Sequence, residues 1–393
     1  MDILAAVARG RRLDRAFADA TRLLDARDRA WCRELVFGIQ RLRGRLDYLL
    51  DRKVKRGLES VKASVLDSLR IGLYELLYMG GVPEYAAVSQ AVDLAQSKGG
   101  RGVSGFANAV LRGIARDGGG PEHFPDPETH PVEFLSTWGS HPRWLVERWL
   151  ARWSADEVRK LIEANNGVPP LSLQCLWDTP EEAKEALEIR QIDARVVGLG
   201  TGCVVIPGHV SLEEAMRAVP AVVQDPAAAL VGSYADPGPE ACVADLCAAP
   251  GGKTAALASN GARVIAVDRS ERRLARLSAN LQRLGLSVEI VASDAAEWRP
   301  AEAGDAVLLD APCSATGTIR RHPDIPHLKS AGDVENLAAV QTRLLDAAVD
   351  MVEPGGRIIF CTCSLQPEEG PEQTAALLAR SASLTMDPVS ARE

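Results

Sequence analysis

The chain has 393 residues, of which 46% are hydrophobic and 25% are charged, and this length predicts two or three domains. The composition is typical of a globular protein and excludes a disordered or fibrous chain. The start, MDILAAVARGRR, does not have the pattern of a secretory signal, and no apolar run is long enough to span a membrane. Since the eight cysteines also lack the spacing of a disulfide scaffold, a cytoplasmic protein is expected.

The formal net charge of −8 is distributed unevenly along the chain. Residues 1–57 carry fifteen Lys/Arg and eight Asp/Glu, a net charge of +7, which leaves −15 for the remaining residues. A basic face that contacts phosphates would have this composition. Solvated arginines on amphipathic helices would have it as well, and the charges alone do not distinguish the two.

The first third of the chain is predicted to be a helical bundle. From Leu4 to about Arg116, apolar residues recur at three- and four-residue spacing. A stretch rich in Gly, Pro and acidic residues, at 117–134, then interrupts the pattern and predicts a linker. From about residue 141 to 233, helical segments mix with short strand-like runs, and this order predicts a small α+β module.

Strands and helices alternate in the last third of the chain. Strands are predicted at 241–247, 264–268, 288–293, 306–310 and 357–363, and helices from residue 252, at 270–284 and at 336–352. Such alternation predicts right-handed βαβ units and a doubly wound parallel sheet, the α/β class.

A glycine-bearing turn, DLCAAPGGKT (residues 245–254), follows the first of these strands. In an open α/β sheet ligands bind at this position, and two glycines let the backbone approach them closely. Cys247 stands where a Walker A loop needs its first glycine, and the G-x-G-x-x-G pattern of dinucleotide loops is absent. Neither phosphate loop is therefore favoured, and a purely structural tight turn stays open as an alternative.

Acidic residues end the next two strands. Asp268 ends the second strand, where a carboxylate can accept both hydroxyls of a ribose, and Asp294 follows the third, where it can reach an adenine. For either residue alone, a helix N-cap is the commoner role. Together with the glycine-bearing turn they predict an adenosyl cofactor at the carboxyl edge of the sheet.

Thiols follow the fourth and fifth strands, Cys313 after Asp310 and the pair Cys361 and Cys363 at 357–363. Carbon 5 of cytosine becomes nucleophilic only after a thiolate adds to carbon 6, and an acid near ring nitrogen 3 must stabilise the added electrons; Asp310 is the candidate. Cysteines at strand ends are more often small buried hydrophobic residues, and a C-x-C pair can also ligate a metal, although a second pair is absent. The two-residue period places Cys361 and Cys363 on one strand face, so the pattern does not choose between them.

Three motifs in this order, DLCAAPGGKT, DAPCSATG and TCSLQPEE, resemble the RNA 5-methylcytosine methyltransferases. The resemblance implies an enzyme that uses S-adenosyl-L-methionine to methylate carbon 5 of a cytosine in RNA, with Cys363 as nucleophile and Cys313 assisting product release, and with no metal. It also places Lys253 and Asp310 with the catalytic residues. The implied cofactor contacts are Cys247, Ala248, Ala249, Pro250, Gly251, Gly252, Lys253, Asp268, Asp294 and Asp310.

Two upstream segments, VPEYAAVSQAVDLA and GFANAVLRGIAR, are similar to the helical RNA-binding domain of the NusB family. The resemblance then implies a multi-domain chain: an all-α NusB-like bundle at 1–125, a small α+β connecting module at 135–233, and an α/β Rossmann-like S-adenosylmethionine methyltransferase domain at 234–393. It implies small-subunit ribosomal RNA as the partner and no membrane, and a monomer is expected.

The chain departs from the family pattern in two places. After LQPEEG the family continues into a further strand pair, so this sheet is expected to lack its last two strands and to expose the edge next to Cys363. An Arg-Val-Asn run of the family is replaced by Gln174-Cys175-Leu176, which changes any substrate contact there. Two alternatives are kept, a transfer-RNA cytosine methyltransferase and a non-catalytic NusB-like RNA-binding scaffold.

Overall fold

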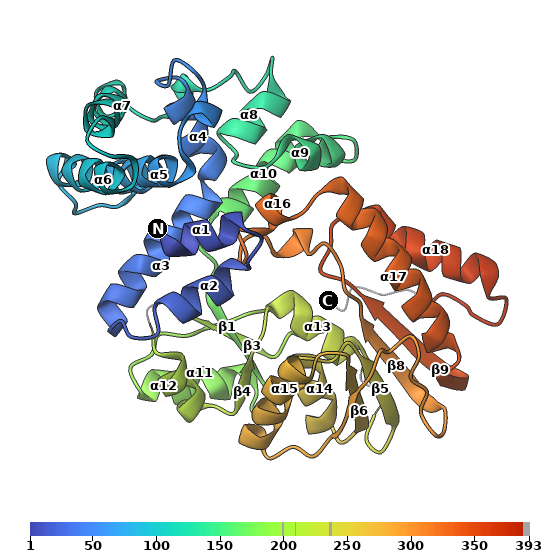
Figure 1. Cartoon of the computed structure of the whole chain (residues 1–393). Helices are drawn as coiled ribbons and strands as arrows, with labels where there is room; N and C mark the ends of the chain where they lie inside the picture. Colours follow the sequence, from blue (N-terminus) through green and yellow to red (C-terminus); the bar gives the residue numbers. More distant parts are fainter. Residues whose placement is uncertain (199, 209, 236–237, 388–393) are drawn as a thin grey trace. The chain divides into compact units, whose positions relative to one another are not determined.

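The computed structural model describes residues 1–198, 200–208, 210–235 and 238–387, and it forms two compact units (Figure 1). The first unit contains Met1–Val168 and Thr318–Ala331, and the second contains Pro169–Gly317 and Gly332–Glu393. Asp236 and Pro237, at the start of the third expected domain, and residues 388–393 at its end lie outside the described residues. Within the described ranges no helix combines the length and the apolar character that crossing a bilayer requires.

The first unit is helical, as its periodicity predicts, because leucines and isoleucines at helical spacing meet in one core. Leu46, Leu69 and Leu111, from three different helices, are fully buried. Local signals mark helix starts: Asp25 caps one helix, and Ser154 with Glu157 forms a capping box at another. The helices are α1 (Asp2–Ala8), α2 (Leu13–Ala20), α3 (Ala26–Arg41), α4 (Arg43–Asp51), η1 (Leu58–Ser60), α5 (Ala63–Tyr78), α6 (Glu84–Gly99), α7 (Val103–Asp117), η2 (Pro121–His123), α8 (Pro131–Thr137), α9 (Arg143–Leu150), α10 (Ala155–Asn166) and α16 (Ile325–Leu328).

A segment from late in the chain, residues 318–331 with α16, completes this helical unit. Asp324, which is 1% exposed, accepts hydrogen bonds from the backbone N–H of Leu13 (3.0 Å) and from Nε of Arg12 (3.1 Å). The Arg41 guanidinium donates to the carbonyl of Arg320 at 3.1 Å. Because these donors sit in the first 41 residues, the segment is an integral part of the unit.

The second unit begins with a four-stranded antiparallel sheet in the order β2-β3-β1-β4. Inward-facing residues such as Leu173 and Ile206 pack against Leu187 of α11 and Ala215 of α12. An α+β module is thus present as expected, but it begins at β1: the helices α9 and α10, which the expected range 141–233 includes, belong to the first unit. The elements of the module are β1 (Leu171–Cys175), α11 (Pro180–Ile189), β2 (Arg195–Val196), β3 (Cys203–Ile206), α12 (Leu212–Ala218) and β4 (Ala221–Val223).

A parallel five-stranded sheet in the order β7-β6-β5-β8-β9 follows in the same unit. The chain starts in the middle at β5, builds outward through β6 and β7, and returns to β8 and β9, so the strand order reverses between β5 and β8. The elements are α13 (Pro226–Ala235), β5 (Cys242–Leu246), α14 (Gly252–Ser259), β6 (Arg263–Asp268), α15 (Glu271–Leu284), β7 (Glu289–Ala292), β8 (Gly304–Asp310), η3 (Thr316–Thr318), α17 (Ala331–Val349), β9 (Val352–Cys361), η4 (Pro367–Glu369) and α18 (Pro371–Arg380).

Both faces of this sheet are covered, as the continuous apolar runs of its strands require. Figure 1 shows α13 and α14 on one side of the sheet and α17 and α18 on the other. Alternate residues of β8 pack into the two cores: Leu308 joins the cluster with residues of α13 and α14, and Leu309 joins the cluster with residues of α17 and α18. The predicted doubly wound architecture is thereby confirmed. Several boundaries differ from those expected. The helix α17 covers Ala331–Val349 rather than 336–352, and its early start buries Val334 fully despite the weak helix former Gly332. The strand β9 covers Val352–Cys361 rather than 357–363.

Candidate active site

A cavity of about 290 Å³ opens at the carboxyl ends of β5, β6, β7 and β8, where the strand order reverses. In open α/β sheets this is the position of ligand sites, and the volume is at the lower end of their range of roughly 300–1,000 Å³. The lining residues are Cys247, Asp268, Arg269, Arg273, Asp294, Ala295, Ala296, Asp310, Ala311, Pro312, Cys313, Ala315, Val340, Arg343, Leu344 and Cys363. The wall therefore combines three carboxylates with three thiols.

Two of the carboxylates follow β6 and β7. Asp268 is 2% exposed and is held by the backbone N–H of Ser270 at 2.9 Å and by the Arg273 guanidinium at 3.0 Å. Ser270, not Asp268, caps α15, so the N-cap role is taken by another residue. Asp294 is exposed, and one of its oxygens accepts the Ala296 N–H at 2.9 Å. Both residues present acceptor oxygens to the cavity, which suits ligand hydroxyl and amino groups.

The loop between β5 and α14 contributes to the site chiefly through its backbone shape. Cys247 lines the cavity and has a φ of +61°, which turns the chain away from β5. Gly251 has a φ of +95°, and a Cβ on it would lie 2.8 Å from Leu277, so this position requires glycine. A Cβ on Gly252 would lie 2.6 Å from the end of the flexible Gln224 side chain, which would have to move. In the described part of the chain, Ala248 to Gly252 do not line the cavity, and their contact with a cofactor stays a prediction.

The third carboxylate, Asp310 at the end of β8, is fixed by two neighbours. Lys253 Nζ donates to Asp310 Oδ2 at 2.8 Å, and the Cys361 thiol donates to Oδ1 at 3.5 Å. Burial alone would lower the pKa of Lys253, but Asp310, together with Cys361 and Asp245, outweighs burial, and the net shift of the pKa is upward. Lys253 therefore stays a cation that holds the Asp310 carboxylate in place.

The two sulfur atoms of Cys313 and Cys363 lie 3.4 Å apart at the cavity wall. Cys313 belongs to the loop after β8, and Cys363 is an exposed residue two positions beyond the end of β9. Because β9 stops at Cys361, the two-residue period does not extend to Cys363, and the two cysteines have different environments. The Cys361 thiol donates a hydrogen bond to Asp310, and burial raises the pKa of this thiol. Cys363, in contrast, lines the cavity.

The protonation of the thiol pair is unequal. The hydrogen bond with Cys313 lowers the pKa of Cys363, and the Lys253 cation adds to this effect, whereas burial and the negative charge of Asp310 oppose it; the net shift is downward. The same hydrogen bond raises the pKa of Cys313, and burial and the Glu369 carboxylate add to the shift. The thiolate is the nucleophilic form of cysteine, so Cys363 is the more reactive of the two.

The loops that carry these cysteines are joined by hydrogen bonds one or two residues further along. Gly317 N–H donates to the Cys363 carbonyl at 2.9 Å, and the hydroxyls of Ser314 and Ser364 are 3.1 Å apart. Both hydroxyls donate to the buried carboxylate of Glu369. The sequence reading missed Glu369, although it lies within the TCSLQPEE motif, six residues after Cys363.

Arginines at the cavity were also missed from the sequence. Arg269, Arg273 and Arg343 line it, and Arg273 pairs with Asp268. A possible signal is that Arg269 directly follows Asp268 and that Arg273 lies one helical turn further on. No group of three or more His, Cys, Asp or Glu residues suited to a metal is found in the described ranges.

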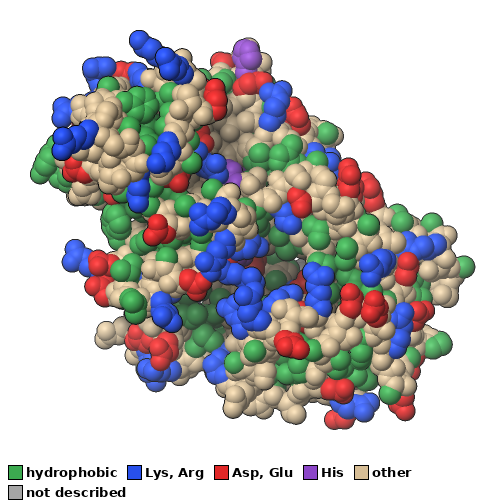
Figure 2. Space-filling model, in the orientation of Figure 1, with side chains coloured by type: hydrophobic (Ala, Val, Ile, Leu, Met, Phe, Trp, Pro, Cys, Tyr) green, Lys and Arg blue, Asp and Glu red, His purple; other side chains and the backbone are tan. Residues whose placement is uncertain are grey.

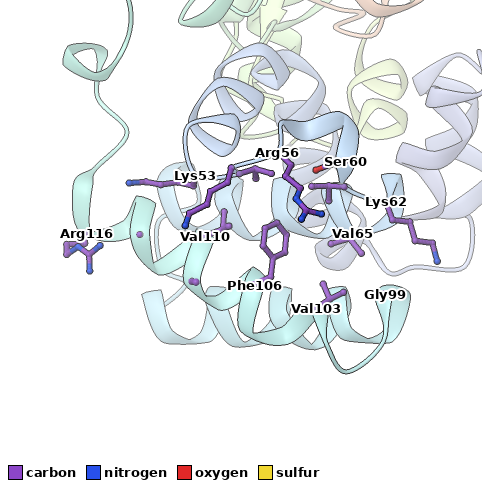
Figure 3. Close-up of a pocket in the computed structure, with 15 residues that line it drawn as sticks. Lys53, Arg56, Ser60, Lys62, Val65, Gly99, Val103, Phe106, Val110 and Arg116 are labelled. Carbon is purple, nitrogen blue, oxygen red and sulfur yellow. The ribbon is translucent and has the colours of Figure 1, made fainter.

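A second cavity, of about 640 Å³, lies within the helical unit (Figure 3). Its floor is apolar and includes Val65, Val103 and Phe106, and around it stand Lys53, Lys55, Arg56, Lys62 and Arg116, without a carboxylate among the lining residues. Lys and Arg side chains are spread over the surface of this bundle in Figure 2. Because no cysteine is among the described residues that line this cavity, it offers no nucleophile for a covalent reaction. Its Lys and Arg side chains suit the binding of an anionic chain.

Comparison with protein families divides the chain into three matched parts. Residues 1–116 match the NusB family, residues 141–213 match the ferredoxin-like domain of RsmF/B-like methyltransferases, and residues 233–393 match 16S rRNA methyltransferase RsmB/F. The expected fold class, a helical NusB-like part, an α+β module and a methyltransferase domain, is confirmed by these matches.

Individual proteins are similar over most of the chain. Ribosomal RNA small subunit methyltransferase B of Sodalis glossinidius is 36% identical over 379 residues, 91% of this chain and 82% of the relative. The protein of the same description from Vibrio vulnificus is 34% identical over 390 residues, 95% of this chain and 88% of the relative.

Two solved structures share the fold. The crystal structure of PH0851 matches with a TM-score of 0.77 at 25% identity, over 96% of this chain and 88% of that chain. A methyltransferase homolog protein from Pyrococcus horikoshii matches with a TM-score of 0.56 at 25% identity, over 65% and 83%.

Proposed function

We propose, because the chain belongs to the 16S rRNA methyltransferase RsmB/F family, that it methylates carbon 5 of a cytosine in small-subunit ribosomal RNA. The methyl donor is S-adenosyl-L-methionine, and Cys363 is the nucleophile. The observation that carries the proposal is the pair of thiols whose sulfur atoms lie 3.4 Å apart at the wall of a cavity lined with carboxylates.

The residues at the cavity fit an adenosyl cofactor by the chemistry of their donors and acceptors. Asp268 and Asp294 offer acceptor oxygens at the ends of β6 and β7, suited to ribose hydroxyls and an adenine amino group. The loop from Cys247 to Lys253, with Asp310, is the candidate for the remaining contacts. When bound, the cofactor supplies an electrophilic methyl group.

Cys363 and Asp310 perform the substrate chemistry in this proposal. The Cys363 thiolate adds to carbon 6 of an unpaired or flipped cytidine, and Asp310, acting as an acid with a proton on its carboxyl group, is the candidate that donates a hydrogen bond to ring nitrogen 3 and so stabilises the added electrons. Lys253 keeps Asp310 in position through its 2.8 Å hydrogen bond. Once carbon 5 carries the methyl group, a base takes the proton from carbon 5, the electron pair of that C–H bond re-forms the double bond between carbons 5 and 6, and Cys363 leaves as a thiolate. Cys313 is proposed to assist this release.

The RNA is recruited, in this proposal, by the NusB-like helices. Their second cavity is surrounded by cations in a chain whose net charge is −8, and such a rim attracts phosphates. Among the rivals, a transfer-RNA substrate would leave ribosomal RNA unchanged, which bisulfite sequencing of both RNAs distinguishes. A non-catalytic scaffold would not bind the cofactor, which a binding titration decides.

The roles of the two cysteines are tested by substitution. Cys363→Ala is expected to abolish tritium transfer from the labelled methyl donor to small-subunit RNA while cofactor binding persists. Cys313→Ala is expected to accumulate a covalent RNA adduct, visible as a band of reduced mobility. Cys32→Ala, on α3 in the helical unit, is the control and should turn over normally. Full turnover by both active-site variants would contradict the assignment.

A further inference from the structure

We propose that Glu369 is a positioning residue, whose buried carboxylate clamps the two cysteine-bearing loops together and thereby fixes which thiol attacks the substrate. The inference rests on the function proposed above, since it concerns the same pair of cysteines. Glu369 ends the short helix η4 and is 0% exposed, so it touches neither solvent nor the cavity.

Both oxygens of the carboxylate are used by the residues next to the cysteines. Oε1 accepts the backbone N–H of Ser314 at 2.7 Å, and Oε2 accepts the hydroxyls of Ser314 and Ser364. Ser314 follows Cys313 directly, and Ser364 follows Cys363 directly. A single side chain therefore joins the loops one residue away from each sulfur.

Glu369 itself is anchored by the helices that cover the sheet. Gln373 Nε2, on α18, donates to the Glu368 carbonyl at 3.0 Å, and Gln373 Oε1 accepts the Thr342 hydroxyl of α17 at 2.9 Å. The turn that carries the carboxylate is thus tied to two helices. A buried carboxylate is expensive to desolvate and is retained where charge and geometry serve a purpose, and here its three donors are neutral groups of the two loops.

The charge of Glu369 also acts unequally on the thiols. It contributes to the raised pKa of Cys313, whereas the Lys253 cation favours ionisation of Cys363. Cys313 therefore remains the hydrogen-bond donor and Cys363 the acceptor across their 3.4 Å contact. A substitution that removes the charge of Glu369 but keeps the shape of its side chain should therefore bring the pKa values of Cys313 and Cys363 closer together.

Thiol alkylation measures this effect without RNA. The full-length chain is treated with iodoacetamide across pH 6 to 9, and the modification of Cys363 and of Cys313 is followed separately by peptide mass spectrometry. Glu369→Gln is expected to reduce the rate ratio of Cys363 to Cys313 by about tenfold or more, and to lower the pH midpoint for Cys313, because the negative charge that raises its pKa is gone. Glu372→Gln, an exposed neighbour on α18, should leave both unchanged.

Methyl transfer provides the functional readout. Because the clamp positions the nucleophile without touching either ligand, Glu369→Gln should lower kcat by about 100-fold while the KM for the methyl donor changes by less than about twofold. Ser364→Ala removes one of the three hydrogen bonds that Glu369 accepts and leaves the Glu369 carboxylate in place. The alkylation rate ratio and kcat should therefore change in the same direction as in Glu369→Gln, but by less.

Two results would overturn the proposal. One is a Glu369→Gln protein that binds the methyl donor normally and keeps the wild-type preference for Cys363. The other is loss of cofactor binding by both Glu369→Gln and Ser364→Ala, which would make Glu369 a support of the whole domain. A different result would refute the proposed function: a wild-type protein that methylates no RNA although iodoacetamide still modifies Cys363 selectively. The alkylation rates of the variants would still test the clamp in that case.

Discussion

Replacing Gly317 by alanine perturbs the position of Cys363 from the other loop. A Cβ at residue 317 would lie 2.8 Å from the Cys363 carbonyl oxygen, whereas ordinary van der Waals contacts begin at 3.4 Å. The φ of Gly317 is not left-handed, so this contact is the main strain. The carbonyl must therefore retreat by about 0.6 Å, the difference between these two distances, and lengthen the 2.9 Å hydrogen bond from Gly317 N–H.

A displacement of this size at the backbone of Cys363, the proposed nucleophile, should reduce kcat by about 10- to 100-fold, since a misplacement of about 1 Å costs about 100-fold. The strain should also lower the free energy of unfolding by about 1–3 kcal/mol, the usual cost of overpacking. Affinity for the methyl donor should change by less than about twofold, because Gly317 does not line the cavity.

The assay combines single-turnover tritium transfer, a cofactor titration and denaturant unfolding. Gly80→Ala is the matched control, because a Cβ there meets no atom within 4 Å, and it should behave as the wild type. A Gly317→Ala protein that binds the methyl donor and keeps the wild-type kcat would refute the reasoning, since the close contact would then have no bearing on Cys363.

Two further predictions concern the helical unit. Burial lowers the pKa of His141 to about 4 from 6.5, so between these pH values the unfolded chain holds more protons and the free energy of unfolding falls as the pH falls. Urea unfolding between pH 6.5 and 4 measures how steeply the free energy of unfolding depends on pH. In His141→Gln this slope should decrease by the equivalent of up to about one bound proton. An unchanged slope would argue against a neutral buried imidazole. Arg56→Glu, at the basic cavity, should weaken RNA binding and reduce the slope of log affinity against log salt by about one to two, measured by filter binding; equal slopes would exclude Arg56 from the RNA interface.

The strand and helix alternation of the catalytic domain was predictable because its strands are short apolar runs that end in acidic or thiol residues. Carboxyl ends of parallel strands converge, and so Asp268, Asp294, Asp310 and Cys313 were expected at one edge, where the structure places them. The strand pattern did not distinguish Cys361 from Cys363, because the distinction depends on the residue at which β9 ends; only the family resemblance favoured Cys363.

Other features of the site depend on contacts between segments distant in the sequence. Glu369 reaches Ser314 across 55 residues, and no local pattern announces that contact. The glycines of the loop after β5 were read as room for a ligand, whereas they also make room for Leu277 and Gln224. Periodicity reports which face of an element is buried, but it does not report which distant residue fills a given space.

The segment 318–331 makes the helical unit discontinuous in sequence, and this affects the order in which the chain can assemble during synthesis. Until the ribosome has produced Asp324, the Leu13 N–H lacks the acceptor it has in the finished protein. Ile319 and Ile325, which are 3% and 2% exposed, likewise fill their places only then. The amino-terminal bundle therefore reaches its final form only after most of the catalytic domain has been translated. A fragment ending at residue 168 would leave exposed the apolar side chains that Ile319 and Ile325 cover in the finished protein.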